Sequence, residues 1–188
     1  FPSPFERVPA AGERYRTNLV IGQSSAFAAR ITDPGPRNMA YPFGLAFTVS
    51  GDLLVSDAIH HRVLFFRRPQ GGDFTTGMAA EKVIGQPDFF TGTRGSGNNR
   101  LFSPRHIAID TDDRLYVADA GNNRVVMYDR VPFAPNGPPP AFSLGGVQSA
   151  QGIYVSQSTG EIWVASTRGN RLSRYPRFAL LPITTAAE

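Results

Sequence analysis

The sequence contains no cysteine and only one lysine among its 188 residues. Without cysteine, disulfide bonds, thiol catalysis and cysteine-ligated zinc or iron–sulfur centres are excluded. No apolar run approaches the roughly 18 to 20 residues that a membrane-spanning helix needs, so we expect no membrane insertion. The chain begins at Phe1 rather than methionine. We therefore expect a mature, cleaved or excerpted form in which a targeting signal can be missing.

Charged residues are also scarce, at 18% of the chain, and the net charge is +4. Nearly all basic residues are arginine, and nowhere do five of them follow one another. Such a charge is compatible with binding to phosphate or to acidic surfaces. Because no basic block is present, charge alone does not argue for a nucleic-acid partner.

Glycine and proline, in contrast, are abundant, with 19 and 16 residues, and hydrophobic residues make up 41% of the chain. The hydrophobic content is enough for a buried core in one domain. The glycines and prolines show no collagen-like period and are spread through the chain. This composition predicts short strands joined by many turns.

An internal repeat dominates the sequence. Residues 42–66 match residues 104–128 without a gap, and residues 151–175 follow the same frame. A missed repeat would misassign the whole fold, so this pattern takes precedence. Equivalent positions hold Pro42, Pro104 and Gln151, then Asp57, Asp119 and Ser166, and then Arg62, Arg124 and Arg171.

Each repeat has the hydrophobic rhythm of strands. Ile107 and Ile109 alternate with other residues, and the same period of two recurs in the two following segments. Polar turn sequences such as "DTDD" and "AGNN" separate the segments. The related sequences "VIGQSSAF", "VIGQPDFF" and "SLGGVQSA" add a fourth strand at the edge of each unit. Each unit is therefore predicted to be a four-stranded antiparallel meander.

The run "YVADAGNNRV", together with "VIGQPDF", resembles the NHL repeat, a blade of a β-propeller. The resemblance extends from Asn18 to about Arg177 and is strongest over 83–130. It implies an all-β fold in which the whole chain, 1–188, is one propeller segment. We expect an edge strand at 15–22 and three four-stranded blades at 42–86, 104–146 and 151–185.

Three blades do not close a ring, since propellers typically have four to eight. An open arc would expose the apolar flanks of its terminal blades. Two interpretations remain open. The chain is either part of a longer propeller or half of a six-bladed ring that a second copy completes as a homodimer.

Two acid–base pairs, Asp57 with Arg62 and Asp119 with Arg124, each span one four-residue turn. An aspartate at the end of one strand and an arginine at the start of the next can form a charge-assisted hydrogen bond. Catalysis needs one such pair, whereas this one occurs in two repeats. We therefore interpret both pairs as structural.

Three histidines are candidates for a binding or metal site. His60 and His61 lie in a turn of the first blade, and His106 lies near the start of the next. In a propeller these positions belong to the same face. Histidine nitrogens with nearby carboxylates could hold zinc or another divalent metal, although the sequence has no HxH or HExxH spacing. The chain as a whole implies no cofactor.

A positive patch is predicted on that face from Arg105, with Arg168 in the turn "TRGNR". Some NHL propellers bind single-stranded RNA in this way, through phosphate contacts and base stacking. Phe89, Phe90 and Phe102 could stack on bases. Alternatively, these phenylalanines attach the long connection to the edge of the blade.

These observations favour a non-enzymatic binding scaffold that presents its loop-rich face to a protein, glycan or other polymer. We expect a bacterial protein, secreted or periplasmic. Two alternatives remain: a metal-dependent propeller lyase or hydrolase that uses the three histidines, and an RNA-binding NHL domain. Because propellers host unrelated functions, the fold alone does not decide among them.

Overall fold

The computed structural model describes residues 19–25, 32–97 and 99–181, which form three antiparallel β-sheets. The first sheet contains β1 (Pro42–Phe47), β2 (Leu53–Asp57), β3 (Arg62–Phe66) and β4 (Lys82–Ile84). The second contains β5 (Pro104–Ile109), β6 (Leu115–Asp119), β7 (Arg124–Tyr128) and β8 (Phe142–Leu144). The third contains β9 (Ala150–Val155), β10 (Ile162–Ser166) and β11 (Arg171–Tyr175). Three short 3-10 turns complete the set: η1 (Ala120–Asn122), η2 (Val131–Phe133) and η3 (Phe178–Leu180).

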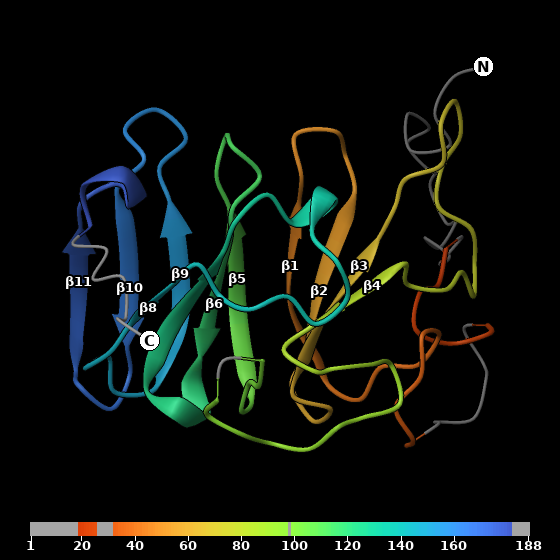
Figure 1. The fold of residues 1–188 in the computed structure, drawn as a ribbon, viewed down its shortest axis with the longest axis horizontal. Coiled ribbons are helices and arrows are strands. Elements are labelled where there is room, and N and C mark those ends of the chain that lie inside the picture. The colour runs from red at the N-terminus through yellow and green to blue at the C-terminus, as the bar shows by residue number, and fades with distance from the viewer. Residues whose placement is uncertain (1–18, 26–31, 98, 182–188) are drawn as a thin grey trace, which may run out of the picture.

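Each sheet is a meander in which every strand pairs with its neighbour along the chain. The first strands of the three sheets, β1, β5 and β9, lie beside one another. Figure 1 shows the first and third sheets on either side of the second. Sheets that stand side by side with their first strands together are arranged as successive propeller blades. The predicted all-β class and the three blades are therefore confirmed.

The middle blade is buried on both faces, and its strand β6 illustrates why. Leu115 and Val117 belong to a core cluster shared with the first blade. Tyr116 and Ala118, which alternate with them, belong to a second cluster shared with the third blade. Because successive side chains of a strand point to opposite faces, one run of apolar residues fills both interfaces.

The third blade is smaller than predicted. Its last strand ends at Tyr175, and no fourth strand occurs in the part of the third blade that the structure describes. Pro176, which has no N–H for a sheet ladder, follows the strand. Residues 178–180 then turn, and the N–H of Leu180 donates to the carbonyl of Arg177.

The predicted edge strand at 15–22 is also absent where it can be assessed. Residues 15–18 lie outside the described residues, and residues 19–22 form no strand. The backbone of Val20 bonds instead to the connection between β3 and β4, through Thr76 Oγ1 and the N–H of Gly77. Both backbone groups of Val20 are thus used without a sheet ladder.

The third repeat is not in frame with the others in its first strand. Ile107 in β5 pairs with Val117. If residue 104 corresponds to 151, the counterparts of these two residues are Tyr154 and Val164. In the structure, however, Val164 pairs with Ile153. The cause is a longer first turn. The N–H of Gly160 bonds to the carbonyl of Ser156, four residues back, whereas the corresponding bond in the second blade spans three. The predicted common frame for 151–175 was therefore wrong by one residue before this turn.

The described residues contain no helix long and apolar enough to cross a membrane.

Candidate functional site

Asp57 and Arg62 form a completely buried ion pair at the turn between β2 and β3. Arg62 Nε donates to Asp57 Oδ2 at 3.0 Å. The other guanidinium nitrogens donate to the carbonyls of Gly35, Asn38 and Phe89, all in the long connections. Burial lowers the pKa of Arg62, and the charge of Asp57 opposes that shift. The pair fastens the connections on both sides of the blade to the turn.

Asp119 and Arg124 repeat this geometry in the second blade. Arg124 Nε donates to Asp119 Oδ2 at 2.7 Å, and its two terminal nitrogens donate to the carbonyls of Ser96 and Arg100. Asp119 Oδ1 accepts the N–H of Phe102 at 2.7 Å. Burial raises the pKa of Asp119, and its hydrogen bonds act in the opposite direction. No oxygen of Asp119 faces an open site, so this geometry gives it no catalytic task.

The third blade keeps the arginine, as Arg171, but has Ser166 in place of the aspartate. Ser166 Oγ donates to the carbonyl of Gln148 at 2.7 Å, and Arg171 donates to the carbonyl of Gly146 at 2.9 Å. A hydroxyl has a proton to donate, so it binds a carbonyl where an aspartate accepts an N–H. The short third connection is thus held by two direct bonds to its carbonyls.

His60 is buried and belongs to the same fastening. Its Nδ1 lies 2.8 Å from Asp57 Oδ2, and its Nε2 lies 2.7 Å from the carbonyl of Thr32. Asn122 takes the equivalent place in the second blade, where its side-chain amide bridges Asp119 and the carbonyl of Gly95. Both nitrogens of His60 are used inside the protein, so neither is free for a metal.

His61 is half-buried and has a backbone φ of 56°. The equivalent turn positions hold Asn123 and Asn170, at 54° and 46°, and asparagine tolerates this left-handed region better than most residues. The N–H of Ser103 donates to His61 Nδ1 at 3.2 Å, and the ring packs edge-on against Phe102. Burial lowers the pKa of His61.

His106 is exposed on β5, and its Nδ1 donates to the carbonyl of Ile153 on β9 at 2.8 Å. This bond links the second and third blades. The three histidines do not converge: the described residues contain no group of three or more His, Asp or Glu side chains that could hold a metal ion. The described residues therefore do not assemble the candidate metal site of the three histidines.

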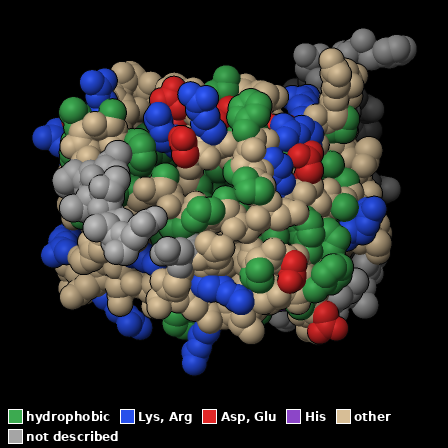
Figure 2. All heavy atoms as spheres, viewed as in Figure 1, with side chains coloured by type: hydrophobic (Ala, Val, Ile, Leu, Met, Phe, Trp, Pro, Cys, Tyr) green, Lys and Arg blue, Asp and Glu red, His purple; other side chains and the backbone are tan. Residues whose placement is uncertain are grey.

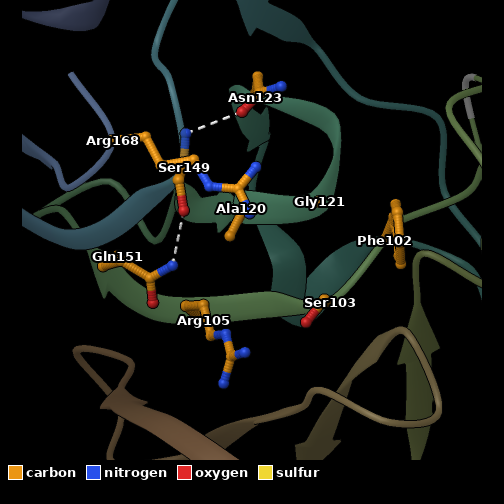
Figure 3. A pocket seen from close by; sticks show the side chains of 9 residues that line it. All are labelled: Phe102, Ser103, Arg105, Ala120, Gly121, Asn123, Ser149, Gln151 and Arg168. Atoms are coloured by element: carbon orange, nitrogen blue, oxygen red, sulfur yellow. Dashed lines mark hydrogen bonds between the residues drawn. The ribbon is translucent and has the colours of Figure 1, made fainter.

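A hollow of about 400 Å³ lies between the second and third blades (Figure 3). It is on the face of the molecule that carries the turns between β2 and β3, β6 and β7, and β10 and β11. Its wall combines the turn after β6, the start of β5, the start of β9 and the turn after β10. Two arginines and no Asp or Glu line it. The lining residues are Phe102, Ser103, Arg105, Ala120, Gly121, Asn123, Ser149, Gln151 and Arg168.

Arg168 and Arg105 place positive charge at this hollow in different ways. Figure 3 shows Arg168 reaching over it beside Ser149 and Ala120, whereas Arg105 extends away from them. Arg168 is exposed and makes no hydrogen bond with any described residue. The guanidinium of Arg105 stacks over Phe43, at 4.9 Å from the ring centre. Both guanidiniums have donors without a partner among the described residues, but only that of Arg168 reaches over the hollow.

The polar wall of the hollow was not predicted from the sequence. Asn123 Oδ1 accepts the N–H of Ser149, and Gln151 Nε2 donates to Ser149 Oγ. The first bond holds the short third connection against the turn of the second blade, and the second ties Ser149 to the start of β9. No motif marks these residues, because they come from two different repeats and their common feature is only their place in space.

The phenylalanines of the long connection differ in exposure. Phe102 lies under Arg94, whose guanidinium is 5.3 Å from the ring centre, and Gly121 packs against the ring. Phe89 packs against the core of the first blade. Only Phe90 of the three is exposed. Phe89 and Phe102 therefore attach the connection to the blades, as in the structural interpretation of these rings.

These features define the class of protein: the chain is a three-bladed segment of a β-propeller. The sequence profile of the NHL repeat matches residues 103–128, which contain β5, β6 and β7. The second blade therefore contains an NHL repeat. A comparison with curated proteins finds no match.

Several solved structures resemble the chain in fold. A streptogramin B lyase structure is 14% identical with a TM-score of 0.47, and the match covers 72% of this chain and 40% of that one. Hydrazine synthase of Kuenenia stuttgartiensis is 18% identical with a TM-score of 0.46, over 77% of this chain and 32% of that one. A putative 6-phosphogluconolactonase from Bacteroides uniformis is 12% identical with a TM-score of 0.48, over 76% and 43%. The chain thus spans less than half the length of each of these structures.

Proposed function

We propose that this chain is a non-enzymatic binding scaffold of NHL type whose loop-rich face binds an acidic segment of a partner protein. The observation that carries the proposal is the hollow between the second and third blades. Its lining holds Arg105 and Arg168 and no carboxylate. A concave surface with positive charge and free donors favours an anionic group.

The donors around the hollow suit a carboxylate. Arg168 offers a planar guanidinium that can bind both oxygens of a carboxylate. Ser103 Oγ makes no hydrogen bond with the described residues and can add a neutral donor. Asn123 uses its side-chain oxygen for Ser149, which leaves its amide N–H groups available. Several donors of this kind would hold the side chain of a glutamate or aspartate.

Single-stranded RNA fits the described face less well than an acidic polypeptide. Recognition of single strands usually combines phosphate contacts with aromatic rings on which bases stack. Arg94 covers Phe102, the one aromatic ring in the lining, and Gly121 packs against it. In Figure 2, which views the blades from the side, acidic side chains lie beside basic ones in the upper part of the molecule, so basic charge is not continuous there.

The alternative of a metal-dependent enzyme receives no support from the positions of the histidines. His60 uses both nitrogens in contacts with Asp57 and Thr32. His106 bonds to the backbone of the next blade. A catalytic zinc site usually has three protein ligands around one ion, and the described residues do not gather such a set.

Binding of a labelled oligo-glutamate peptide tests the proposal, with a poly-uridine oligonucleotide as the second probe. We expect Arg168→Glu to weaken oligo-glutamate binding about tenfold or more, since hydrogen bonds to charged groups contribute about 1.5–3 kcal/mol. Arg68→Glu is the matched control, because Arg68 is also exposed but does not line the hollow. It follows the end of β3 that is opposite to the turn between β2 and β3. Binding should weaken as salt rises.

Three results would overturn the proposal. The first is a lack of oligo-glutamate binding at low salt. The second is an equal loss in Arg168→Glu and Arg68→Glu, which would indicate attraction to net charge rather than to the hollow. The third is a clear preference for poly-uridine, which would favour the RNA-binding alternative.

A further inference from the structure

The free flank of the first blade is an apolar surface centred on β1. Leu45, Phe47 and Val49 alternate along the strand and its turn, and their side chains are 62%, 53% and 73% exposed. The residue between the first two, Ala46, packs against the core shared with the second blade. The exposed side chains therefore point away from the second blade, on the side where the described residues form no blade. We call them the β1 flank.

The outer part of the same side is already covered by the chain. Leu64 and Phe66 of β3 are buried in a cluster with Met39, Phe74 and Met78, which belong to the connections. The exposed area is therefore confined to the inner strand of the blade. A partner needs to reach only β1 and its turn.

The free flank of the third blade carries apolar residues at the opposite end of the described chain. Tyr154 on β9 and Leu172 on β11 are 61% and 66% exposed. Both point the same way as Trp163, because Trp163 pairs with Tyr154 and Ala165, two residues further, pairs with Leu172. The alternating residues Ile153 and Val164 are buried against the second blade. We call this surface the β9 flank.

Strand register shows that the two flanks are the two halves of one type of interface. Leu45 pairs with Val55 as Ile107 pairs with Val117, so Leu45 is the counterpart of Ile107. Ile107 is buried, in the core cluster that the second blade shares with the first. The β1 flank is therefore equivalent to the surface of the second blade that packs against the preceding blade.

The β9 flank corresponds to the other half. Trp163 pairs with Tyr154 as Tyr116 pairs with Ala108, so Tyr154 is the counterpart of Ala108 and Trp163 of Tyr116. Ala108 and Tyr116 lie in the cluster that the second blade shares with the third. The β9 flank therefore presents the positions that, in the second blade, pack onto the following blade.

We infer that two copies of this chain associate head to tail, with the β9 flank of each copy packed on the β1 flank of the other. The same kind of blade-to-blade contact already occurs twice within the chain. A second copy supplies both missing halves at once, and two such contacts close a ring of six blades, within the usual range of four to eight. Closure removes both exposed apolar flanks from water.

Light scattering after size-exclusion chromatography tests this inference. The wild-type protein is expected at twice the chain mass of 20.4 kDa. Leu45→Asp on the β1 flank and Tyr154→Asp on the β9 flank should each shift the mass to that of one chain. Phe133→Asp is the control, because Phe133 is 82% exposed and lies between β7 and β8, away from both flanks. It should remain a dimer.

A mixing experiment separates head-to-tail contacts from a symmetric contact of like flanks. When the two monomeric variants are combined, the intact β9 flank of Leu45→Asp can pack on the intact β1 flank of Tyr154→Asp. The mixture should therefore recover dimers, with weaker association than the wild type because only one of two contacts is intact. Urea unfolding checks that each variant is folded. Phe47→Ser and Leu172→Ser provide a second pair on the same flanks.

A wild-type mass of one chain at every concentration would overturn the inference, as would open polymers larger than two chains. A Tyr154→Asp variant that remains a dimer would also overturn it, since like flanks would then be in contact. The hollow between the second and third blades lies within one copy. Oligo-glutamate binding can therefore succeed or fail independently of association.

Discussion

Arg124 Nε donates to Asp119 Oδ2 at 2.7 Å across the turn that joins β6 and β7. The aspartate has no solvent exposure, and the guanidinium continues to two carbonyls of the preceding connection. A backbone N–H, a side-chain amide and a guanidinium surround this carboxylate, so neither of its oxygens is left to contact a substrate. The same arrangement recurs at Asp57 and Arg62, so its common task is to hold connections against blades.

Replacing Asp119 by asparagine should destabilise the fold strongly. The change leaves the Arg124 guanidinium largely buried without a counter-charge, and breaking such a pair costs about 3–5 kcal/mol. Urea unfolding measures the loss. Asp112→Asn is the control, because Asp112 is exposed and Arg114 keeps its contact with Asp110. A loss for Asp119→Asn no larger than for the control would show that the pair does not hold the turn.

Ser166→Ala tests the corresponding position of the third blade. The change removes one neutral hydrogen bond, to the carbonyl of Gln148, so we expect a loss of about 1 kcal/mol in the free energy of unfolding. This loss should be clearly smaller than that of Asp119→Asn. Urea unfolding of both variants under the same conditions provides the comparison. Equal losses would contradict the assignment of different bond types to the two positions.

The blades and their acid–base pairs could be predicted from the sequence because both repeat. Apolar residues alternate at Ile107 and Ile109 because the two faces of their strand pack against different neighbours. Three matching repeats imply three sheets. The turn positions could be predicted for the same reason. His61, Asn123 and Asn170 occupy equivalent places and all have positive φ.

The hollow could not be predicted, because its residues share no motif. Arg105 and Arg168 were identified as candidates from the sequence. Ser149 and Gln151 were not, because it is the path of the short third connection that brings Ser149 to Asn123 and Gln151 to Ser149. The role of His60 was also inaccessible. Its partner Thr32 lies 28 residues away, so the sequence suggested a free ligand where the structure has a buried bridge.

His61→Asn should flatten the pH dependence of stability. Burial lowers the pKa of His61 below its usual 6.5 in the folded protein. Below pH 6.5 the unfolded chain therefore binds more protons at this residue than the folded one. The free energy of unfolding then falls as pH falls from about 6.5. Asparagine does not titrate, and it occupies the same turn position in the other two blades.

Urea unfolding across about pH 5 to 7, the range in which histidines titrate, measures the effect. His60 and His106 are present in both proteins, so the difference between the two pH profiles reports His61 alone. His61→Ala is the comparison for the backbone, since alanine is less favourable than asparagine at positive φ. Identical pH profiles for the wild type and His61→Asn would contradict the prediction.

Two buried tyrosines should respond in opposite ways to loss of their hydroxyls. Tyr116 Oη donates to Asp110 Oδ2 at 2.8 Å, whereas Tyr128 Oη has no hydrogen-bond partner among the described residues. Tyr116→Phe should lower the free energy of unfolding by about 1.5 kcal/mol, as for a bond to a charged group. Tyr128→Phe removes an unpaired buried hydroxyl and should be neutral or stabilising. Equal losses in urea unfolding would contradict this contrast.

The contact between β1 and β5 should tolerate no side chain at Gly44. A Cβ atom there would lie 2.9 Å from backbone atoms of Arg105, His106 and Ile107. Backbone cannot rotate away as a side chain can, so Gly44→Ala should separate the first two blades and cost about 1–3 kcal/mol in urea unfolding. Gly145→Ala is the control, because a Cβ atom there meets nothing within 4 Å. If both variants unfolded at the same urea concentration, the close packing of the two inner strands would not contribute to stability.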